Sequence, residues 1–95
     1  MSNKFYQGGT IICSITVKNA AGTLVDPATS MKIAVEEVLP IAVVKVPATA
    51  MTKDSTGTYH YDLLTVGYGD GTYELEYEAT DGTRITIQKD TLELQ

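Results

Sequence analysis

Apolar and polar residues alternate with a period of two along most of the chain. Over residues 10–18 every second position is apolar, and the positions between are mostly polar. Similar alternation returns over residues 31–36, 58–63 and 72–79, and again from residue 83 onward. A period of two is typical of a strand with one buried face, so each of these segments is predicted to be a strand.

Two segments need a closer argument. Residues 30–39, SMKIAVEEVL, come nearest to a helical pattern, but their β-branched residues and the flanking prolines favour a strand. Pro40 and Pro47 bracket residues 41–46, and proline cannot donate a hydrogen bond to a neighbouring strand. Residues 41–46 are therefore expected to form only a short or edge strand. The chain as a whole is predicted to be all-β.

The last two strands raise a question of register. A simple two-residue turn at residues 81–82 would place core residues opposite polar ones on both faces of the hairpin. We therefore expect a three- or five-residue loop, or a bulge, that sets Tyr77 opposite Ile87 and Ala79 opposite Ile85.

The apolar parity of the final segment also changes along its length. Apolar residues stand at odd positions at its start and at even positions at its end: Ile85, Ile87, Leu92 and Leu94. A second irregularity is needed to bury both pairs, and we expect a β-bulge near Lys89 and Asp90.

Residues 70–82 contain three glutamates at every second position: Glu74, Glu76 and Glu78. With Tyr73, Leu75, Tyr77 and Ala79 facing the core, the glutamates form an outer column about 6.8 Å apart. Side chains at that spacing do not converge as a calcium site or a pair of catalytic carboxylates requires. A solvated strand face is the favoured interpretation, and Arg84 is expected to be the nearest cation.

Loop aspartates are better calcium candidates than this column, although their spacing matches no motif: Asp54, Asp70 and Asp81. We expect no metal and no cofactor.

Length and composition limit the classes of protein to consider. The 95 residues are 43% hydrophobic and 20% charged, which is the composition of one globular domain spanning residues 1–95. No apolar run approaches the roughly 20 residues of a membrane helix, and the first nine residues have no apolar segment of a secretory signal. With one cysteine, no internal disulfide can form.

Charge is distributed unevenly between the two halves. Residues 1–53 carry five lysines against three acidic residues, whereas residues 54–95 carry nine acidic residues against Arg84 and Lys89. An acidic half with no basic cluster repels phosphate backbones, so neither nucleic acid nor a membrane is an expected partner.

Three single residues could carry chemistry. Cys13 lies on the inward face of its strand, where a buried, unreactive thiol is the favoured interpretation over a nucleophile. His60, the one histidine, faces outward and is interpreted as a surface residue. Tyr68 stands between two glycines in a loop and is either a plug on the end of the domain or an exposed contact.

Two copies of a Gly-Thr-Tyr phrase open consecutive strands, in TGTYHYDL and DGTYELEY. With the opening YQGGTIICSITVKNAAGTLVD, this order resembles bacterial immunoglobulin-like modules and the filamin repeat over most of the chain. The resemblance implies an immunoglobulin-like β-sandwich of about seven strands with Greek-key connections. It also implies that Tyr73 is a tyrosine corner, that Leu75 replaces the strand F cysteine, and that Cys13 lies on strand B.

The segments AMTKDSTGTYHYDL, GTYELEYEATDG and DTLEL also resemble short stand-alone immunoglobulin-like proteins of tailed phages. That resemblance implies a non-enzymatic virion accessory, such as a capsid decoration or a head or tail surface protein, made in the host cytoplasm. Such a protein would dock on a repeated protein lattice and could self-associate. The alternative is a surface adhesin or carbohydrate-binding module of a larger extracellular protein. The candidate partner contacts are Tyr68, Ile41, Val43 and Lys45.

Overall fold

The structure is a computed structural model that describes residues 3–39 and 41–95. These residues form eight strands and no helix: β1 (Asn3–Phe5), β2 (Thr10–Thr16), β3 (Ser30–Leu39), β4 (Val43–Ala50), β5 (Thr52–Ser55), β6 (Thr58–Leu64), β7 (Gly71–Asp81) and β8 (Arg84–Leu94). The all-β prediction is confirmed, including the strand at residues 30–39. The described residues contain no helix that is long and apolar enough to cross a membrane.

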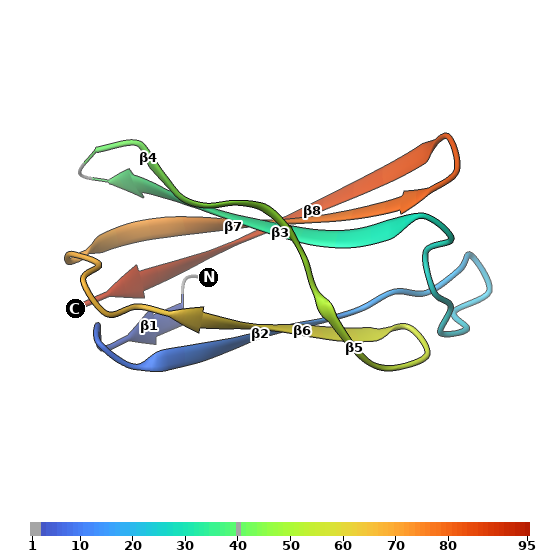
Figure 1. Ribbon diagram of the computed structural model, residues 1–95, viewed down its shortest axis with the longest axis horizontal. Coiled ribbons are helices and arrows are strands. Elements are labelled where there is room, and N and C mark those ends of the chain that lie inside the picture. The colour runs from blue at the N-terminus through green and yellow to red at the C-terminus, as the bar shows by residue number, and fades with distance from the viewer. Residues whose placement is uncertain (1–2, 40) are drawn as a thin grey trace.

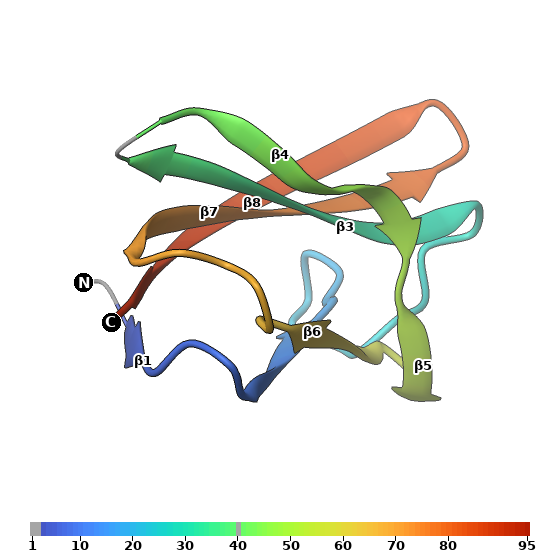
Figure 2. The ribbon, with the colours of Figure 1, turned by 60° about the vertical axis from the view of Figure 1, so that its left-hand side comes forward.

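The strands form two layers that face each other (Figures 1 and 2). The larger sheet has five strands in the order β1-β8-β7-β3-β4, and the smaller has three in the order β2-β6-β5. The chain passes directly from β4 in one sheet to β5 in the other, with Met51 between them (Figure 2). About seven strands were expected. Six of the eight strands in the described residues match segments predicted from the sequence, and the short β1 and β5 were not predicted.

The core lies between the sheets and is built from the alternating residues of the central strands. β7 contributes Tyr73, Leu75 and Tyr77, and its partner β3 contributes Ile33 and Val35, all of them buried. The smaller sheet faces them with one buried row, which consists of Ile11, Cys13, Tyr59 and Leu63. The inward parity predicted for these strands is confirmed. Because the chain has one cysteine and no internal disulfide, its stability depends mainly on burial of these apolar side chains.

The expected register of the final hairpin is wrong. Strands β7 and β8 pair without a shift from Asp81 opposite Arg84 to Gly71 opposite Leu94. The turn consists of residues 82 and 83, and Gly82 has a φ of 64°, the positive value that the first position of a type II′ turn requires.

This continuous register exposes two isoleucines that were expected in the core. Ile85 and Ile87 lie on the outer face, opposite Thr80 and Glu78, and are 60% and 52% exposed. The expected bulge near residues 89–90 is also wrong, because the ladder has no irregularity there. Leu92 is buried opposite Tyr73. Because the ladder has no irregularity, even-numbered residues of β8 face inward and odd-numbered residues face outward along the whole strand.

Strand β4 is an edge strand, as predicted, but it does not end at Pro47. It runs from Val43 to Ala50 beside β3, and the register shifts between the pairs Val35–Val46 and Ile33–Thr49. A proline on an open edge loses no ladder bond when its nitrogen faces away from the partner, and a local irregularity accommodates it.

The glutamate column lies on the outer face of the larger sheet, as predicted. Its nearest cation is Lys89 rather than Arg84, because the observed register brings Lys89 opposite Glu76. The Lys89 Nζ atom lies 3.4 Å from the Glu74 carboxylate and 3.8 Å from that of Glu76. Like charges in the column are therefore partly neutralised on the sheet itself.

Candidate functional site

Tyr68 packs against one end of the sandwich. Its ring stacks on Tyr73, with centroids 5.5 Å apart and an angle of 17° between the planes. The Lys45 Nζ atom lies 5.4 Å from the centre of the Tyr68 ring, within the range of a cation–π contact. Of the two interpretations left open by the sequence, the structure favours the plug. Burial, and secondarily Tyr61, raises the pKa of the half-buried Tyr68 hydroxyl.

Lys45 also approaches a buried acid. Its Nζ atom lies 3.8 Å from the carboxylate of Glu37, a residue of β3 whose side chain is largely buried. Burial raises the pKa of the Tyr73 hydroxyl, and Glu37 adds to that effect. The two predicted contact residues Tyr68 and Lys45 are thus part of one packed group that also includes Tyr73 and Glu37.

The other two predicted contact residues are exposed. Ile41, between β3 and β4, is 67% exposed, and Val43, the first residue of β4, is 41% exposed. The β3–β4 connection lies at the same end of the sandwich as the β1–β2 and β6–β7 connections (Figure 1). These three connections and their adjoining strand ends carry most of the exposed large apolar side chains. We name this set the apolar end, which consists of Tyr6, Leu39, Ile41, Val43, Leu64 and Val66.

Hydrogen bonds join two of the three connections of the apolar end, the β1–β2 and β6–β7 connections. The buried Thr65 hydroxyl donates to the Gly9 carbonyl at 2.6 Å and accepts from the Gly8 amide at 2.9 Å. The Gln7 side-chain amide also donates to the Asp70 carboxylate, a third bond between the same two connections. The β1–β2 and β6–β7 connections, which carry Tyr6 and Val66, are therefore tied to each other.

Sequence reasoning missed Tyr6, Leu39, Leu64 and Val66. A usable signal was present, because these large apolar residues stand beside turn residues rather than inside an alternating run: Leu39 precedes Pro40, and Val66 precedes Gly67. All four residues are exposed at strand ends or in connections, and a group of exposed apolar residues at one end of a domain indicates a contact surface.

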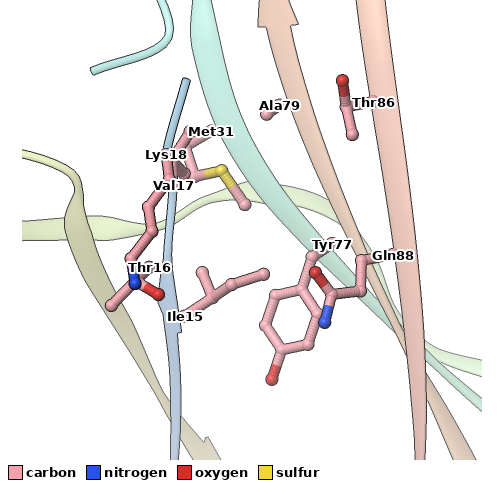
Figure 3. A pocket seen from close by; sticks show the side chains of 9 residues that line it. All are labelled: Ile15, Thr16, Val17, Lys18, Met31, Tyr77, Ala79, Thr86 and Gln88. Atoms are coloured by element: carbon pink, nitrogen blue, oxygen red, sulfur yellow. The ribbon is translucent and has the colours of Figure 1, made fainter. Parts of the chain in front are cut away.

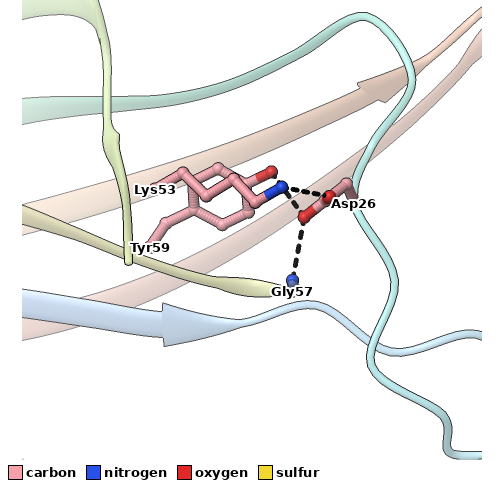
Figure 4. Close-up of polar contacts among 4 residues, drawn as sticks. All are labelled: Asp26, Lys53, Gly57 and Tyr59. Atoms are coloured by element: carbon pink, nitrogen blue, oxygen red, sulfur yellow. Dashed lines mark hydrogen bonds and ion pairs between the residues drawn. The ribbon is translucent and has the colours of Figure 1, made fainter. Parts of the chain in front are cut away.

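At the opposite end, Asp26 joins the long β2–β3 connection to the β5–β6 turn (Figure 4). Its carboxylate accepts from Lys53 Nζ at 2.7 Å, from the Gly57 amide at 2.8 Å and from the Tyr59 hydroxyl at 3.0 Å. The hydrogen bond from Lys53, followed by that from Gly57, lowers the pKa of Asp26 to about 2. All three donors to the Asp26 carboxylate are groups of this chain, so Asp26 has a structural role: it is a tie between the β2–β3 connection and the β5–β6 turn.

Gly57 is required at this tie for steric reasons. Its φ is +72°, and a Cβ atom there would lie 2.8 Å from the Val17 carbonyl oxygen and 2.9 Å from Leu24 Cβ. Both the backbone conformation and the close approach of the β2–β3 connection exclude a side chain.

Cys13 is buried on the inward face of β2, as predicted. Burial raises the pKa of its thiol to about 11, and the charges of Asp62 and Asp90 add to that effect. At neutral pH the thiol is protonated and a poor nucleophile.

His60 lies on the outer face of β6, as predicted, and its ring is flanked by carboxylates. Nδ1 is 2.6 Å from Asp54 and Nε2 is 3.9 Å from Asp62. Of the three aspartates considered for calcium, only Asp70 lies in a loop, because Asp54 belongs to β5 and Asp81 is the last residue of β7. Neither Asp70 nor Asp81 is part of this group. Within residues 3–39 and 41–95, no three acidic, histidine or cysteine side chains gather closely enough to hold a metal ion.

The side of the sandwich between β2 and β8 is open. A cavity of about 180 Å³ lies there, with Ile15 and Met31 approaching Tyr77 and Gln88 across it (Figure 3). Two further hollows lie along the same side, one beside Cys13 and Asp90 and the other beside Asp26 and Arg84. Sequence reasoning missed this open side, because it assigned Ile85 and Ile87, rather than Thr86 and Gln88, to the inner face.

Comparisons with protein-family models, with characterised proteins and with solved structures gave no match to this chain.

Proposed function

We propose that the chain is an immunoglobulin-like β-sandwich with Greek-key connections that serves as a non-enzymatic structural or binding module. The strand order supports the fold: β2, β5 and β6 correspond to strands B, D and E, and β3, β4, β7 and β8 correspond to C, C′, F and G. In that fold a tyrosine near the start of strand F bonds back to an upstream backbone group. The Tyr73 hydroxyl donates to the Gly69 carbonyl at 2.7 Å, and Leu75, two residues later, is buried.

The apolar end carries the functional part of the proposal. Six large apolar side chains are exposed in connections and adjoining strand ends at one end of a small domain, whereas soluble monomers rarely expose large apolar patches. Interface cores are enriched in aromatic and apolar residues and poor in charge, which this composition matches. Lys45 of β4 contacts the Tyr68 ring, which links β4 to the β6–β7 connection.

The partner proposed for the apolar end is a virion structural protein in a repeated lattice. This part of the proposal rests on the resemblance of the TGTYHYDL and GTYELEYEATDG segments to immunoglobulin-like virion accessories of tailed phages. The groups that could suggest an enzyme have structural surroundings instead: Cys13 is buried with a raised pKa, and His60 pairs with Asp54.

Particle association tests the proposal. Lysates of cells that produce the protein are separated on a density gradient, and an antibody detects the protein in particle fractions and in free fractions. The wild type is expected with the particles, and the double variant Ile41→Asp, Val66→Asp is expected in the free fractions. Ile12→Asp is the matched control, because Ile12 on β2 is as exposed as Ile41, at 67% each, but lies outside the apolar end.

Two outcomes would contradict the proposal. A double variant that remains with the particles would show that the apolar end does not dock. A wild type that is absent from particles but binds glycans would favour the adhesin or carbohydrate-binding alternative.

A further inference from the structure

Strand β8 is paired along its whole length on one side only. Its inner edge pairs with β7 from Arg84 to Leu94, whereas β1 covers the outer edge only opposite residues 92–94. In the part of the chain that the structure describes, no strand pairs with the outer edge of residues 84–90. An open edge of this kind is a template for another strand.

The backbone groups on that outer edge can be identified. The Gln95 amide donates to the Phe5 carbonyl at 2.9 Å, and the Gln95 carbonyl accepts from the Gln7 amide at 3.3 Å, so both groups of Gln95 point outward. Successive residues of a strand point their backbone groups to opposite edges. The amide and carbonyl groups of Ile85, Ile87 and Lys89 therefore point to the open edge.

The edge lacks two of the devices that protect natural sheet edges, a proline and a bulge, and its charged residues are Arg84, Lys89 and Asp90. Residues 84–90 contain no proline, their ladder has no bulge, and the exposed Ile85 and Ile87 lie beside the edge on the outer face. The opposite edge of the same sheet, at β4, has Pro47 and a register shift. Exposed isoleucines beside an edge without a proline or a bulge indicate a strand that can pair with another strand.

The sequence of this edge is complementary to itself when it is read antiparallel. With Ile87 opposite Ile87 of a second copy, Arg84 faces Asp90 of that copy, and the same charge pair occurs again on the other side of the two-fold axis. Ile85 then faces Lys89 and Thr86 faces Gln88. The pairs that exchange backbone bonds are 85 with 89 and 87 with 87, which are the residues whose groups point outward. Opposite charges and β-branched residues directly across an antiparallel pair are both favourable.

We propose that two copies of the chain associate through antiparallel pairing of β8 with β8, centred on Ile87, which joins their five-stranded sheets into one continuous sheet. The interface is isologous, because the same residues serve on both sides of the axis. Thr86 and Gln88 of the second copy come to lie at the mouth of the cavity in Figure 3, whose own wall includes Thr86 and Gln88.

The acidic column is compatible with this pairing. Edge-to-edge contact sets the two β7 strands three strand spacings apart, about 14 Å, so the glutamate columns do not face each other. That separation exceeds the screening length of about 8 Å at physiological salt.

Sedimentation of purified protein over a concentration series tests the pairing independently of the proposed virion function. The wild type is expected to form dimers. In a dimer of Arg84→Asp, or of Asp90→Arg, residue 84 of each copy faces a residue 90 of the same charge, so two repulsive pairs form. Each single variant is expected to weaken the dimer about tenfold or more. The double variant Arg84→Asp, Asp90→Arg restores both pairs and is expected to restore the wild-type affinity.

Proline variants test which edge is used. Ile87→Pro removes an amide that points to the open edge of β8, so the monomer keeps its ladder while the dimer is lost. Ser14→Pro is the matched control on β2, which is an edge strand of the smaller sheet in the described residues. The Gly9 carbonyl accepts from Thr65 and the Val17 amide donates to Gly57, so these odd-numbered residues point their backbone groups toward β6 and the β5–β6 turn. The backbone groups of Ser14 therefore point to the open edge of β2. Ser14→Pro is expected to leave the dimer intact.

A disulfide test fixes the register and does not depend on proline. Under oxidising conditions Ile87→Cys is expected to cross-link the two copies, because position 87 meets itself on the axis, and Ile85→Cys is not. Circular dichroism confirms that each variant is folded. The proposal is overturned by a wild type that stays monomeric throughout, by failure of the double charge swap to restore binding, or by loss of the dimer in Ser14→Pro rather than Ile87→Pro.

Discussion

Strands β7 and β8 are neighbours of equal length, eleven residues each, and yet their inner faces differ. The inner row of β7 is apolar and buried, with Tyr73, Leu75 and Tyr77 in the core. The inner row of β8 begins with Thr86, Gln88 and Asp90, which are exposed, and becomes buried only at its end.

The number of strands in each sheet explains the difference. A sheet of three strands cannot cover a sheet of five, so β7 lies over the core while the first half of β8 extends past the edge of the smaller sheet. Alternation in a sequence therefore predicts a strand, but burial of one face also requires a second layer above it.

The largest effect is expected from truncating the inner row of β7. Leu75→Ala should lower the free energy of unfolding by about 2–5 kcal/mol, because the side chain is buried and leaves a cavity. Gln88→Ala, on the exposed inner row of β8, should change it by no more than about 0.5 kcal/mol. Urea denaturation measures both, and comparable losses would remove the distinction between the two strands.

A smaller effect is expected from the hydroxyl of Tyr73. Tyr73→Phe leaves the Gly69 carbonyl without its donor at 2.7 Å and should cost about 1–3 kcal/mol. Tyr68→Phe keeps the ring that stacks on Tyr73 and should cost less than about 0.5 kcal/mol. The same denaturation measurements apply, and equal losses for the two variants would count against the tyrosine corner.

The polar row of β8 also affects the titration of buried groups. Burial, with a further contribution from Asp90, raises the pKa of Cys13 to about 11 and that of Tyr77 to about 12. Because the folded pKa of Cys13 is higher than the ordinary thiol value of 9.0, its contribution to stability is complete below pH 9 and is lost as the pH rises toward 11. Cys13→Ala should flatten the decline in stability over that interval.

Thiol labelling provides an independent check of the same residue. At neutral pH a thiol reagent should react with the native protein far more slowly than with the denatured protein. Equal rates would show that Cys13 is accessible and ionised in the fold.

The smallest effect is expected on the outer face of β8. Ile87→Thr, measured on the monomer at low concentration, should change the free energy of unfolding by no more than about 0.5 kcal/mol, since Ile87 is 52% exposed. A loss as large as that of Leu75→Ala would place Ile87 in the core, as the sequence alone suggested.

The strands of the core were predictable because each has a full apolar row and a partner layer. The inward parity of β2, β3, β6 and β7, the edge position of β4 and the outer glutamate column all followed from alternation and from Pro40 and Pro47. The short β1 and β5 were not predicted, because strands of three and four residues are too short for a period of two to be recognised.

The register of β8 was not predictable from apolar content alone. Ile85 and Ile87 are as hydrophobic as Leu92 and Leu94, and sequence reasoning assigned both pairs to the core. A tight two-residue turn fixes the parity of the whole strand, and only one pair could then face inward. Of the candidate contacts, Ile41 and Val43 are exposed, whereas Tyr68 and Lys45 pack together, a contact between distant parts of the chain that no local pattern encodes.

The parallel pairing of β1 with the end of β8 has a kinetic consequence. It sets Asn3 opposite Leu92, so almost the entire chain separates two residues that are neighbours in the sheet. The entropy of closing so long a loop must be met before this pairing contributes any stability, and sandwiches dominated by such contacts fold in milliseconds to seconds. We therefore expect β1 to join the sheet late in folding, after the hairpins have formed, with refolding much slower than for a helical protein of the same length.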